Sequence, residues 1–215
     1  MYLVLCIIFS VFAYSAQETV KVSVFYESLC PASQEFIQTQ FYPVYQKLGP
    51  EALTVKLFPY SQVKVKKSEL NIKCQHGEEE CFANKIQACA LGLNDSNENS
   101  INFVGCIMST DEPQKKSFNK KCARKNKVSW TDIKACINSD QGDTFIYEIY
   151  NTTKALTPKL NWVPHIRFND VFNRTAEQAA RENLLHTVCE KYETKKPDGC
   201  DEAHPISTEE EEDDF

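Results

Sequence analysis

The sequence lacks any apolar run long enough to cross a membrane. Its longest such run covers residues 3–9, whereas a spanning helix needs about 18 apolar residues, so a membrane span is excluded. The body of the chain also lacks an excess of one charge. The formal net charge is −6, and residues 209–214 supply six acidic side chains by themselves. A nearly neutral body gives no reason to expect nucleic acid or an anionic membrane surface as a partner.

The chain of 215 residues has a suitable length for one domain with an insertion, and its two ends differ from its body. No Lys or Arg precedes the apolar run, but Ala13 and Ser15 have the spacing of a signal-peptidase site. We therefore interpret residues 1–15 as a secretory signal peptide and expect the folded domain over residues 16–195. Residues 196–215 are rich in Pro, Gly and acidic side chains, which predicts a disordered tail.

Ten cysteines agree with a secretory route. Removal of Cys6 with the signal peptide leaves nine, and an odd number implies one reactive or intermolecular thiol. If that thiol is Cys30, eight candidates for structural disulfides remain, with their pairing open: Cys74, Cys81, Cys89, Cys106, Cys122, Cys136, Cys189 and Cys200. Three sequons predict glycosylation at Asn94, Asn151 and Asn173.

The rest of the chain is organised around residues 20–37. Alternating valines followed by an apolar run predict a buried strand at residues 20–26, and Cys30-Pro31 then opens a helix that Pro43 should end or kink. Free amide N–H groups and the helix dipole at such a position favour a thiolate, which is the nucleophilic form. We therefore predict that Cys30 is a nucleophile, the alternatives being a buried small side chain or half of a structural disulfide.

The remaining patterns give the order of elements. A second strand at residues 53–58 completes a βαβ unit, and residues 68–140 are expected to form a helical insertion with six of the cysteines and no clear strand. Its helices include one with Phe82, Ile86, Cys89, Ala90 and Leu93 on one face, and one capped by Ser129. A helix over residues 143–155, a hairpin over residues 162–172 with its turn at 169–170, and a helix from a capping box at 175–178 to about residue 192 complete the domain.

This order predicts an α/β, thioredoxin-like fold with a disulfide-rich helical insertion. In that fold a proline at the start of the third strand faces the nucleophile turn, usually after a cis peptide bond. Pro164 occupies that place in the sequence, so we assign it to the site; an ordinary trans proline is the alternative.

The most specific stretch of the chain is residues 74–89, which read C-Q-H-G-E-E-E-C-F-A-N-K-I-Q-A-C. It matches in full the signature C-Q-H-G-x-x-E-C-x-x-N-x-x-x-x-C of the gamma-interferon-inducible lysosomal thiol reductase family. The resemblance extends from about residue 20 to residue 189 and includes Trp130, Cys136, Gly142 and residues 162–164. It implies a glycosylated thioredoxin-like protein, without a cofactor, that reduces protein disulfides in acidic or secretory compartments and serves immune defence.

One departure from the family limits the chemistry. The active dithiol of the family is C-x-x-C, and here it reads Cys30-Pro-Ala-Ser33. A second thiol normally resolves the mixed disulfide formed with substrate. Ser33 can hydrogen-bond the Cys30 thiolate but cannot make that attack, so a small thiol such as glutathione or cysteine would have to complete the cycle. Ser61, His165 and Asp170 are further departures from the family's usual residues.

Two functional hypotheses follow. The first is a secreted or lysosomal disulfide oxidoreductase that acts on protein disulfides, with Cys30 as nucleophile, Ser33 at the resolving position and Pro164 opposite. The second is a secreted binding or immune effector that keeps the scaffold while catalysis has decayed. A zinc site at Cys74, His76, Cys81 and Cys89 is less favoured than structural disulfides, so we expect no metal.

Two further features leave alternatives open. His76 and His165 are interpreted as packed or solvated side chains, with tuning of Cys30 as the alternative. The basic run at residues 115–127 is typical of a solvated face, and a patch for sulfated glycans or an acidic partner is its alternative.

Overall fold

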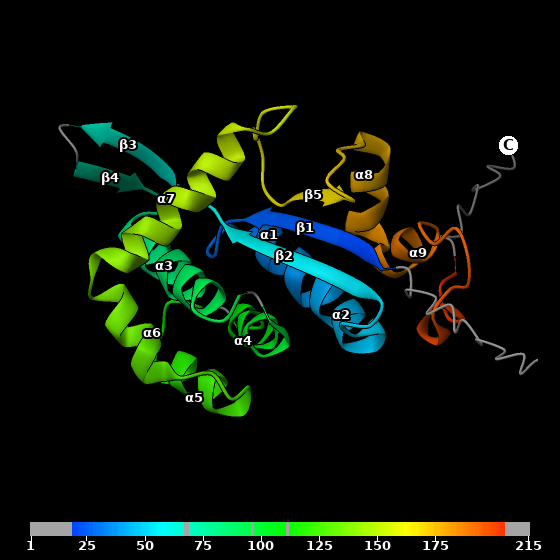
Figure 1. Cartoon of the computed structure of the whole chain (residues 1–215), viewed down its shortest axis with the longest axis horizontal. Helices are drawn as coiled ribbons and strands as arrows, with labels where there is room; N and C mark the ends of the chain where they lie inside the picture. The colour runs from blue at the N-terminus through cyan, green and yellow to red at the C-terminus, as the bar shows by residue number, and fades with distance from the viewer. Residues whose placement is uncertain (1–18, 67–68, 96, 111, 205–215) are drawn as a thin grey trace, which may run out of the picture.

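Three strands form the central sheet of the computed structural model, which describes residues 19–66, 69–95, 97–110 and 112–204. The predicted signal peptide and the acidic run at 209–214 lie outside these residues. Strand β1 (Val20–Tyr26) runs in the middle, parallel to β2 (Leu53–Pro59) and antiparallel to β5 (His165–Phe168). Val22 and Val24 on one face and Ser23 and Phe25 on the other are all buried, as expected for a central strand covered on both faces (Figure 1). The predicted parallel βαβ unit is therefore confirmed.

The helical connection after β1 does not end at Pro43. It comprises α1 (Pro31–Phe36), a π-helical turn (Ile37–Phe41) and α2 (Tyr42–Leu48). In the π turn the N–H of Tyr42 bonds to the carbonyl of Ile37, which shifts the helix register directly before the proline. Of the two alternatives predicted for Pro43, an end of the helix was wrong, because this shift lets the helix continue past a residue without an N–H.

The insertion is helical, as predicted, but it is preceded by a two-stranded ribbon. Strands β3 (Gln62–Lys66) and β4 (Glu69–Lys73) pair antiparallel and project beside α7 in Figure 1. The expectation of no clear strand from about residue 68 onward was therefore wrong for β4, in which Leu70 and Ile72 alternate with polar residues over only five positions. The insertion's helices are α3 (Glu78–Gly92), α4 (Glu98–Met108), α5 (Lys116–Lys125) and α6 (Trp130–Ile137).

Disulfides hold the insertion together. All eight candidate cysteines are paired, as Cys74–Cys81, Cys89–Cys136, Cys106–Cys122 and Cys189–Cys200. The first three bridges lie within the insertion. The fourth holds a short 3-10 turn (Asp198–Cys200) against the domain, so the start of the predicted tail is ordered. The predicted cap of α6 is confirmed, since the Ser129 hydroxyl accepts a hydrogen bond from the amide of Asp132.

The last third of the chain departs from the expected elements at three points. Helix α7 (Asp140–Lys154) begins earlier than predicted, and Ile146 is its fully buried core residue. The predicted turn forms at Asn169 and Asp170, which both adopt the positive φ that tight hairpins favour, but the returning strand is reduced to one bridge between Phe168 and Val171. The predicted final helix is two helices, α8 (Arg174–Glu182) and α9 (Leu184–Cys189), and α8 is capped by Asn173 instead of Thr175.

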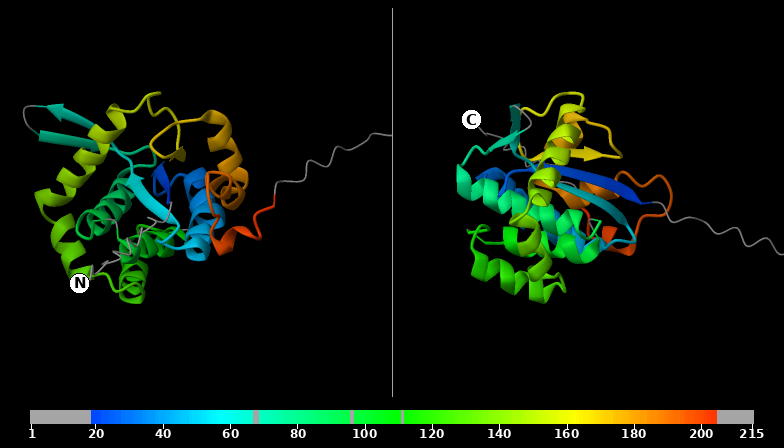
Figure 2. Two further views of the ribbon diagram at one scale, coloured as in Figure 1. Left: turned by 45° about the vertical axis from the view of Figure 1, so that its right-hand side comes forward. Right: turned by 60° about the vertical axis from the view of Figure 1, so that its left-hand side comes forward.

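Figures 1 and 2 show how these parts surround the sheet. Helices α1 and α2 lie along β1 and β2, α8 lies beside β5, and α5 and α6 lie farthest from the sheet. Within the described residues, no helix combines the length and apolar character that a membrane span requires.

Candidate active site around Cys30

Cys30 stands where the turn after β1 meets α1. Its N–H donates to the carbonyl of Glu27 (3.2 Å), and its carbonyl accepts from the N–H of Gln34 (2.9 Å), so the residue caps the helix whose first position is Pro31. Cys30 is partly exposed and is the free cysteine of the described residues. This places a single accessible thiol at a helix N-terminus.

Ser33 lies one helical turn further on and is fully buried. Its hydroxyl oxygen lies 3.4 Å from the backbone N–H of Glu27, which donates to it. The Ser33 hydroxyl thus bonds to the backbone. The described residues show no hydrogen bond between Ser33 and the Cys30 sulfur. Ser33 helps to close the turn from which Cys30 projects.

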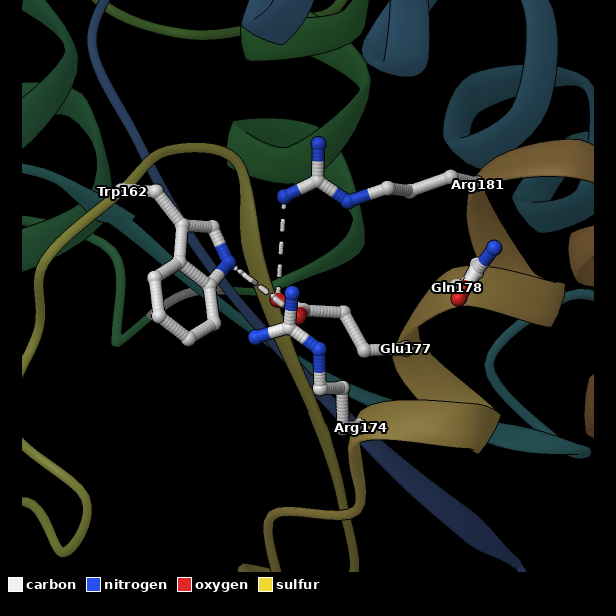
Figure 3. Close-up of a pocket in the computed structure, with 5 residues that line it drawn as sticks. All are labelled: Trp162, Arg174, Glu177, Gln178 and Arg181. Atoms are coloured by element: carbon white, nitrogen blue, oxygen red, sulfur yellow. Dashed lines mark hydrogen bonds and ion pairs between the residues drawn. The ribbon is translucent and has the colours of Figure 1, made fainter.

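Pro164 follows a cis peptide bond with Val163. Together with Ala32 and Phe36 of α1 and Arg181 of α8, it lines a hollow of about 200 Å³. A second hollow, of about 320 Å³, shares Arg181 and is lined by Trp162, Arg174, Glu177 and Gln178 (Figure 3). A recess therefore extends along the cis-proline loop, beginning two residues from Cys30.

A buried carboxylate, Glu177, supports the cis-proline loop from α8. It accepts hydrogen bonds from the indole N–H of Trp162 (3.0 Å) and the backbone N–H of Ile166 (3.1 Å), on either side of Pro164. Figure 3 shows the Trp162 and Arg181 side chains directed at this carboxylate. Burial raises the pKa of Glu177, but the adjacent His165 ring and the hydrogen bonds from Trp162 and Ile166 outweigh it, and the pKa lies below its ordinary value.

His165 is a packed side chain, as its default interpretation proposed. It is fully buried, its ring stacks on Phe172 with centroids 4.7 Å apart, and Nδ1 lies 3.3 Å from Glu177 Oε1. Its side chain is therefore part of the support of the cis-proline loop.

Helix α3 contributes three buried polar side chains to the turn before Cys30. Glu80 Oε1 accepts from the N–H of Leu29 (3.1 Å), and Asn84 Oδ1 accepts from the N–H of Ser28 (2.9 Å). One turn on, Gln87 Nε2 donates to the Ser28 hydroxyl (3.0 Å) and its Oε1 accepts from the hydroxyl of Tyr26 (2.5 Å). Sequence reasoning did not assign these three residues. Their spacing of four and three places them on one helix face, and Glu80 and Asn84 are fixed letters of the 74–89 signature.

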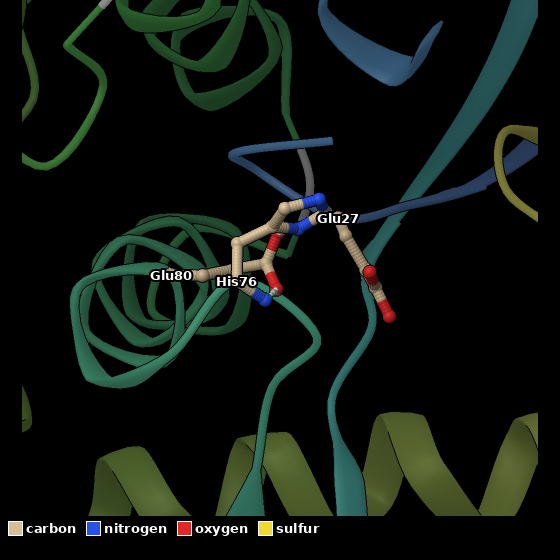
Figure 4. A group of neighbouring side chains, drawn as sticks. All are labelled: Glu27, His76 and Glu80. Atoms are coloured by element: carbon tan, nitrogen blue, oxygen red, sulfur yellow. Dashed lines mark hydrogen bonds and ion pairs between the residues drawn. The ribbon is translucent and has the colours of Figure 1, made fainter. Parts of the chain in front are cut away.

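Glu27, His76 and Glu80 gather beside this turn, from the end of β1, the loop before α3 and the first turn of α3 (Figure 4). Both oxygens of Glu80 are already occupied: Oε1 lies 2.8 Å from His76 Nδ1, and Oε2 accepts from the His76 N–H (2.9 Å). Burial, reinforced by the charge of Glu80 and opposed by His76, raises the pKa of Glu27 to about 7. The group is better explained as a buried acid network than as a cation site. The zinc alternative at Cys74, Cys81 and Cys89 lacks thiolates, since all three sulfurs are in disulfides.

The three sequon asparagines lie at the surface to different degrees. Asn151, within α7, and Asn173, at the start of α8, are exposed, whereas Asn94 is half-buried and its amide donates to the carbonyl of Ala90 (2.8 Å).

Comparison with known proteins decides the family. The family model described as gamma interferon inducible lysosomal thiol reductase (GILT) matches residues 21–126. GILT-like protein 1 of Drosophila melanogaster is 31% identical over 210 residues, covering 91% of this chain and 84% of the relative. The chain belongs to this family. The gamma-interferon-inducible lysosomal thiol reductase of Carassius auratus is a further GILT relative, 30% identical and covering 84% of this chain and 72% of its own length.

Solved structures confirm the thioredoxin-like fold. Reduced DsbA from Mycobacterium tuberculosis superposes with a TM-score of 0.56 at 19% identity, covering 88% of this chain and 93% of that structure. The reduced disulfide bond oxidoreductase DsbG of the same organism has a TM-score of 0.56 at 21% identity, with 88% of each chain covered. This GILT protein thus places its free cysteine on the scaffold of a family of thiol reductases, with a serine three residues further on.

Proposed function

We propose that this GILT protein is a secreted or lysosomal disulfide oxidoreductase that acts on protein disulfides through Cys30 alone. The observation that carries the proposal is the arrangement of its cysteines. Of the nine cysteines in the described residues, eight are paired, and the ninth is a partly exposed thiol at the start of α1, the helix that lines a recess together with Pro164. Relatives named thiol reductases support the same chemistry.

The reaction begins with attack of the Cys30 thiolate on one sulfur of a substrate disulfide. That bond breaks, a Cys30–substrate mixed disulfide forms, and the departing substrate sulfur takes up a proton. Ser33 has no thiol, so a small external thiol, glutathione or cysteine, attacks the Cys30 sulfur and releases the second substrate thiol. A second molecule of that thiol then frees Cys30 and leaves as a small disulfide, so two external thiols supply the two electrons.

The side chains around Cys30 support a division of roles. Pro164 and the recess between α1 and α8 offer a surface on which an extended substrate segment can lie beside the thiol. Glu177 holds the two flanks of this loop, which positions Pro164.

The buried hydroxyl of Ser33 also supports the second candidate, a secreted binding or immune effector with decayed catalysis, because no internal thiol can release a captured partner. Turnover separates the two. A protein with one reducible disulfide is incubated with the mature chain and excess glutathione, and reduction is followed against a Cys30→Ser control. The oxidoreductase predicts multiple turnovers that the control lacks. Equal rates for both proteins contradict the proposal, and one stoichiometric capture without release favours the effector.

A further inference from the structure

The Cys74–Cys81 disulfide is linked by hydrogen bonds to the turn that presents Cys30. Cys81 directly follows Glu80, whose carboxylate accepts from the N–H of Leu29 (3.1 Å), the residue before Cys30. Its partner Cys74 lies with its sulfur 3.3 Å from the hydroxyl of Ser61 and 3.9 Å from Asn84 Nδ2. Each half of this bridge therefore lies next to a residue of α3 that holds the Cys30 turn.

The Cys74–Cys81 bridge also fixes the loop that holds Glu80. Its half-cystines are seven residues apart, and the loop between them carries His76, whose N–H and Nδ1 contact the two oxygens of Glu80 at 2.9 and 2.8 Å. Glu80 is fully buried, so it depends on these partners. A buried carboxylate that loses its hydrogen bonds is destabilised and moves toward solvent or takes up a proton.

Exposure distinguishes this bridge from the other disulfides of the described residues. Cys74 and Cys81 are both partly exposed, whereas each other pair contains at least one buried half-cystine: Cys89 and Cys136, Cys122, and Cys189 and Cys200. A small thiol in solution therefore has its best access at Cys74–Cys81.

We propose that Glu80 and Asn84 are positioning residues for Cys30, and that the Cys74–Cys81 disulfide keeps them in place as a redox-sensitive control of the site. This inference deepens the proposed function and rests on it. Two molecules of a small thiol open the bridge: the first forms a mixed disulfide with one half-cystine and releases the other as a thiol, and the second leaves as the small disulfide. The thiol that regenerates Cys30 at low concentration thus disables the site at high concentration.

The test uses the full mature chain and a measurement that needs no turnover. In a Cys74→Ser/Cys81→Ser variant, Cys30 remains the free thiol, so its alkylation by iodoacetamide is measured directly, together with hydrogen exchange of the Ser28 and Leu29 amides. The matched control is Cys189→Ser/Cys200→Ser, which removes a bridge at the other end of the domain. We expect about tenfold less protection of the two amides relative to the amides of β1, a comparison that cancels any global loss of stability, and a changed alkylation rate, in the first variant only; tenfold is the effect of one lost hydrogen bond. Equal values in both variants overturn the proposal.

A second pair of variants decides the matter even if the bridge variant does not fold. Glu80→Gln keeps an oxygen that can accept from the Leu29 N–H, whereas Glu80→Ala does not. Protection of the Leu29 amide retained in Glu80→Gln and lost in Glu80→Ala supports positioning, and the same protection in both variants contradicts it. If these amides respond as expected but the wild-type protein shows no turnover, the proposed function fails while the positioning network stands.

Discussion

The buried acid Glu27 gives the sharpest test of the network around the Cys30 turn. Its side chain is 5% exposed, one carboxylate oxygen has no hydrogen-bond partner, and its pKa is raised from 4.5 to about 7 by burial and by Glu80, against His76. In the unfolded chain the pKa returns to its ordinary value. Between these two values the folded protein binds more protons at Glu27 than the unfolded chain, so stability must fall as pH rises.

The shift converts to a loss of about 2–3 kcal/mol of unfolding free energy, allowing for partial solvent screening. The contribution of the neutral carboxyl is fully present below the unfolded pKa and is lost as pH rises through about 7. Glu27→Gln replaces the carboxyl with a neutral group of the same shape. Urea unfolding of both proteins, with disulfides intact, is measured from about pH 4 to about pH 8. The contributions of other titrating groups largely cancel in the difference between the two unfolding free energies.

We expect the unfolding free energy of Glu27→Gln, relative to that of the wild type, to rise by about 2–3 kcal/mol between about pH 4 and about pH 8. A constant offset between the proteins is acceptable, because the new amide has its own hydrogen-bonding needs. An exposed control, Glu51→Gln, should show a much smaller change. A Glu27→Gln difference that does not vary with pH would refute the reasoning about this acid.

Three further predictions concern the site and the fold. Ser33→Cys restores a C-x-x-C dithiol and should raise turnover at least about tenfold in the glutathione assay, because an internal thiol reacts at a far higher effective concentration; an unchanged rate would show that residue 33 cannot reach the mixed disulfide. Gly105→Ala should lose about 1–3 kcal/mol of unfolding free energy, because a Cβ at residue 105 meets the Tyr42 ring well inside contact distance. The control is Gly199→Ala, where the Cβ meets a movable Leu48 methyl group and the loss should be smaller. Equal losses in the two variants would contradict the packing of α4 on α2. Cys189→Ser/Cys200→Ser opens a loop with a sequence separation of 11 and should cost about 3 kcal/mol in urea unfolding; no loss would mean that this bridge does not constrain the chain.

Much of the fold follows from patterns within short stretches. The alternating valines of β1, the Cys30-Pro31 helix start and the parallel pairing with β2 are local signals that the structure confirms. The boundaries that failed depend on tertiary context. The π turn before Pro43 is a change of helix register that leaves no trace in apolar periodicity. The alternation in β4 spans only five residues, and its pairing with β3 is visible only in the folded protein.

The residues of the candidate site likewise fall into those that the sequence predicts and those that depend on tertiary packing. The positions of Cys30 at a helix start and of Pro164 after a cis bond could be predicted from the chain, because their places relative to the strands define them. Glu177 could not, because its partners Trp162 and Ile166 lie 15 and 11 residues away and meet it only through packing of α8 on β5. Asn84 reaches across 56 residues to Ser28. Its place in the signature marked it as unusual, but only the folded contact shows what it holds.

The account depends most on Cys30 being the one sulfur that captures substrate. The direct measurement is to mix the mature protein with a substrate that contains one disulfide, quench with acid, and map every disulfide by mass spectrometry of non-reduced peptides. The account predicts one mixed disulfide, on the peptide that contains Cys30, with the eight remaining cysteines paired as in the structure. A substrate sulfur found on any other cysteine, or Cys30 found bonded within the chain, would contradict it.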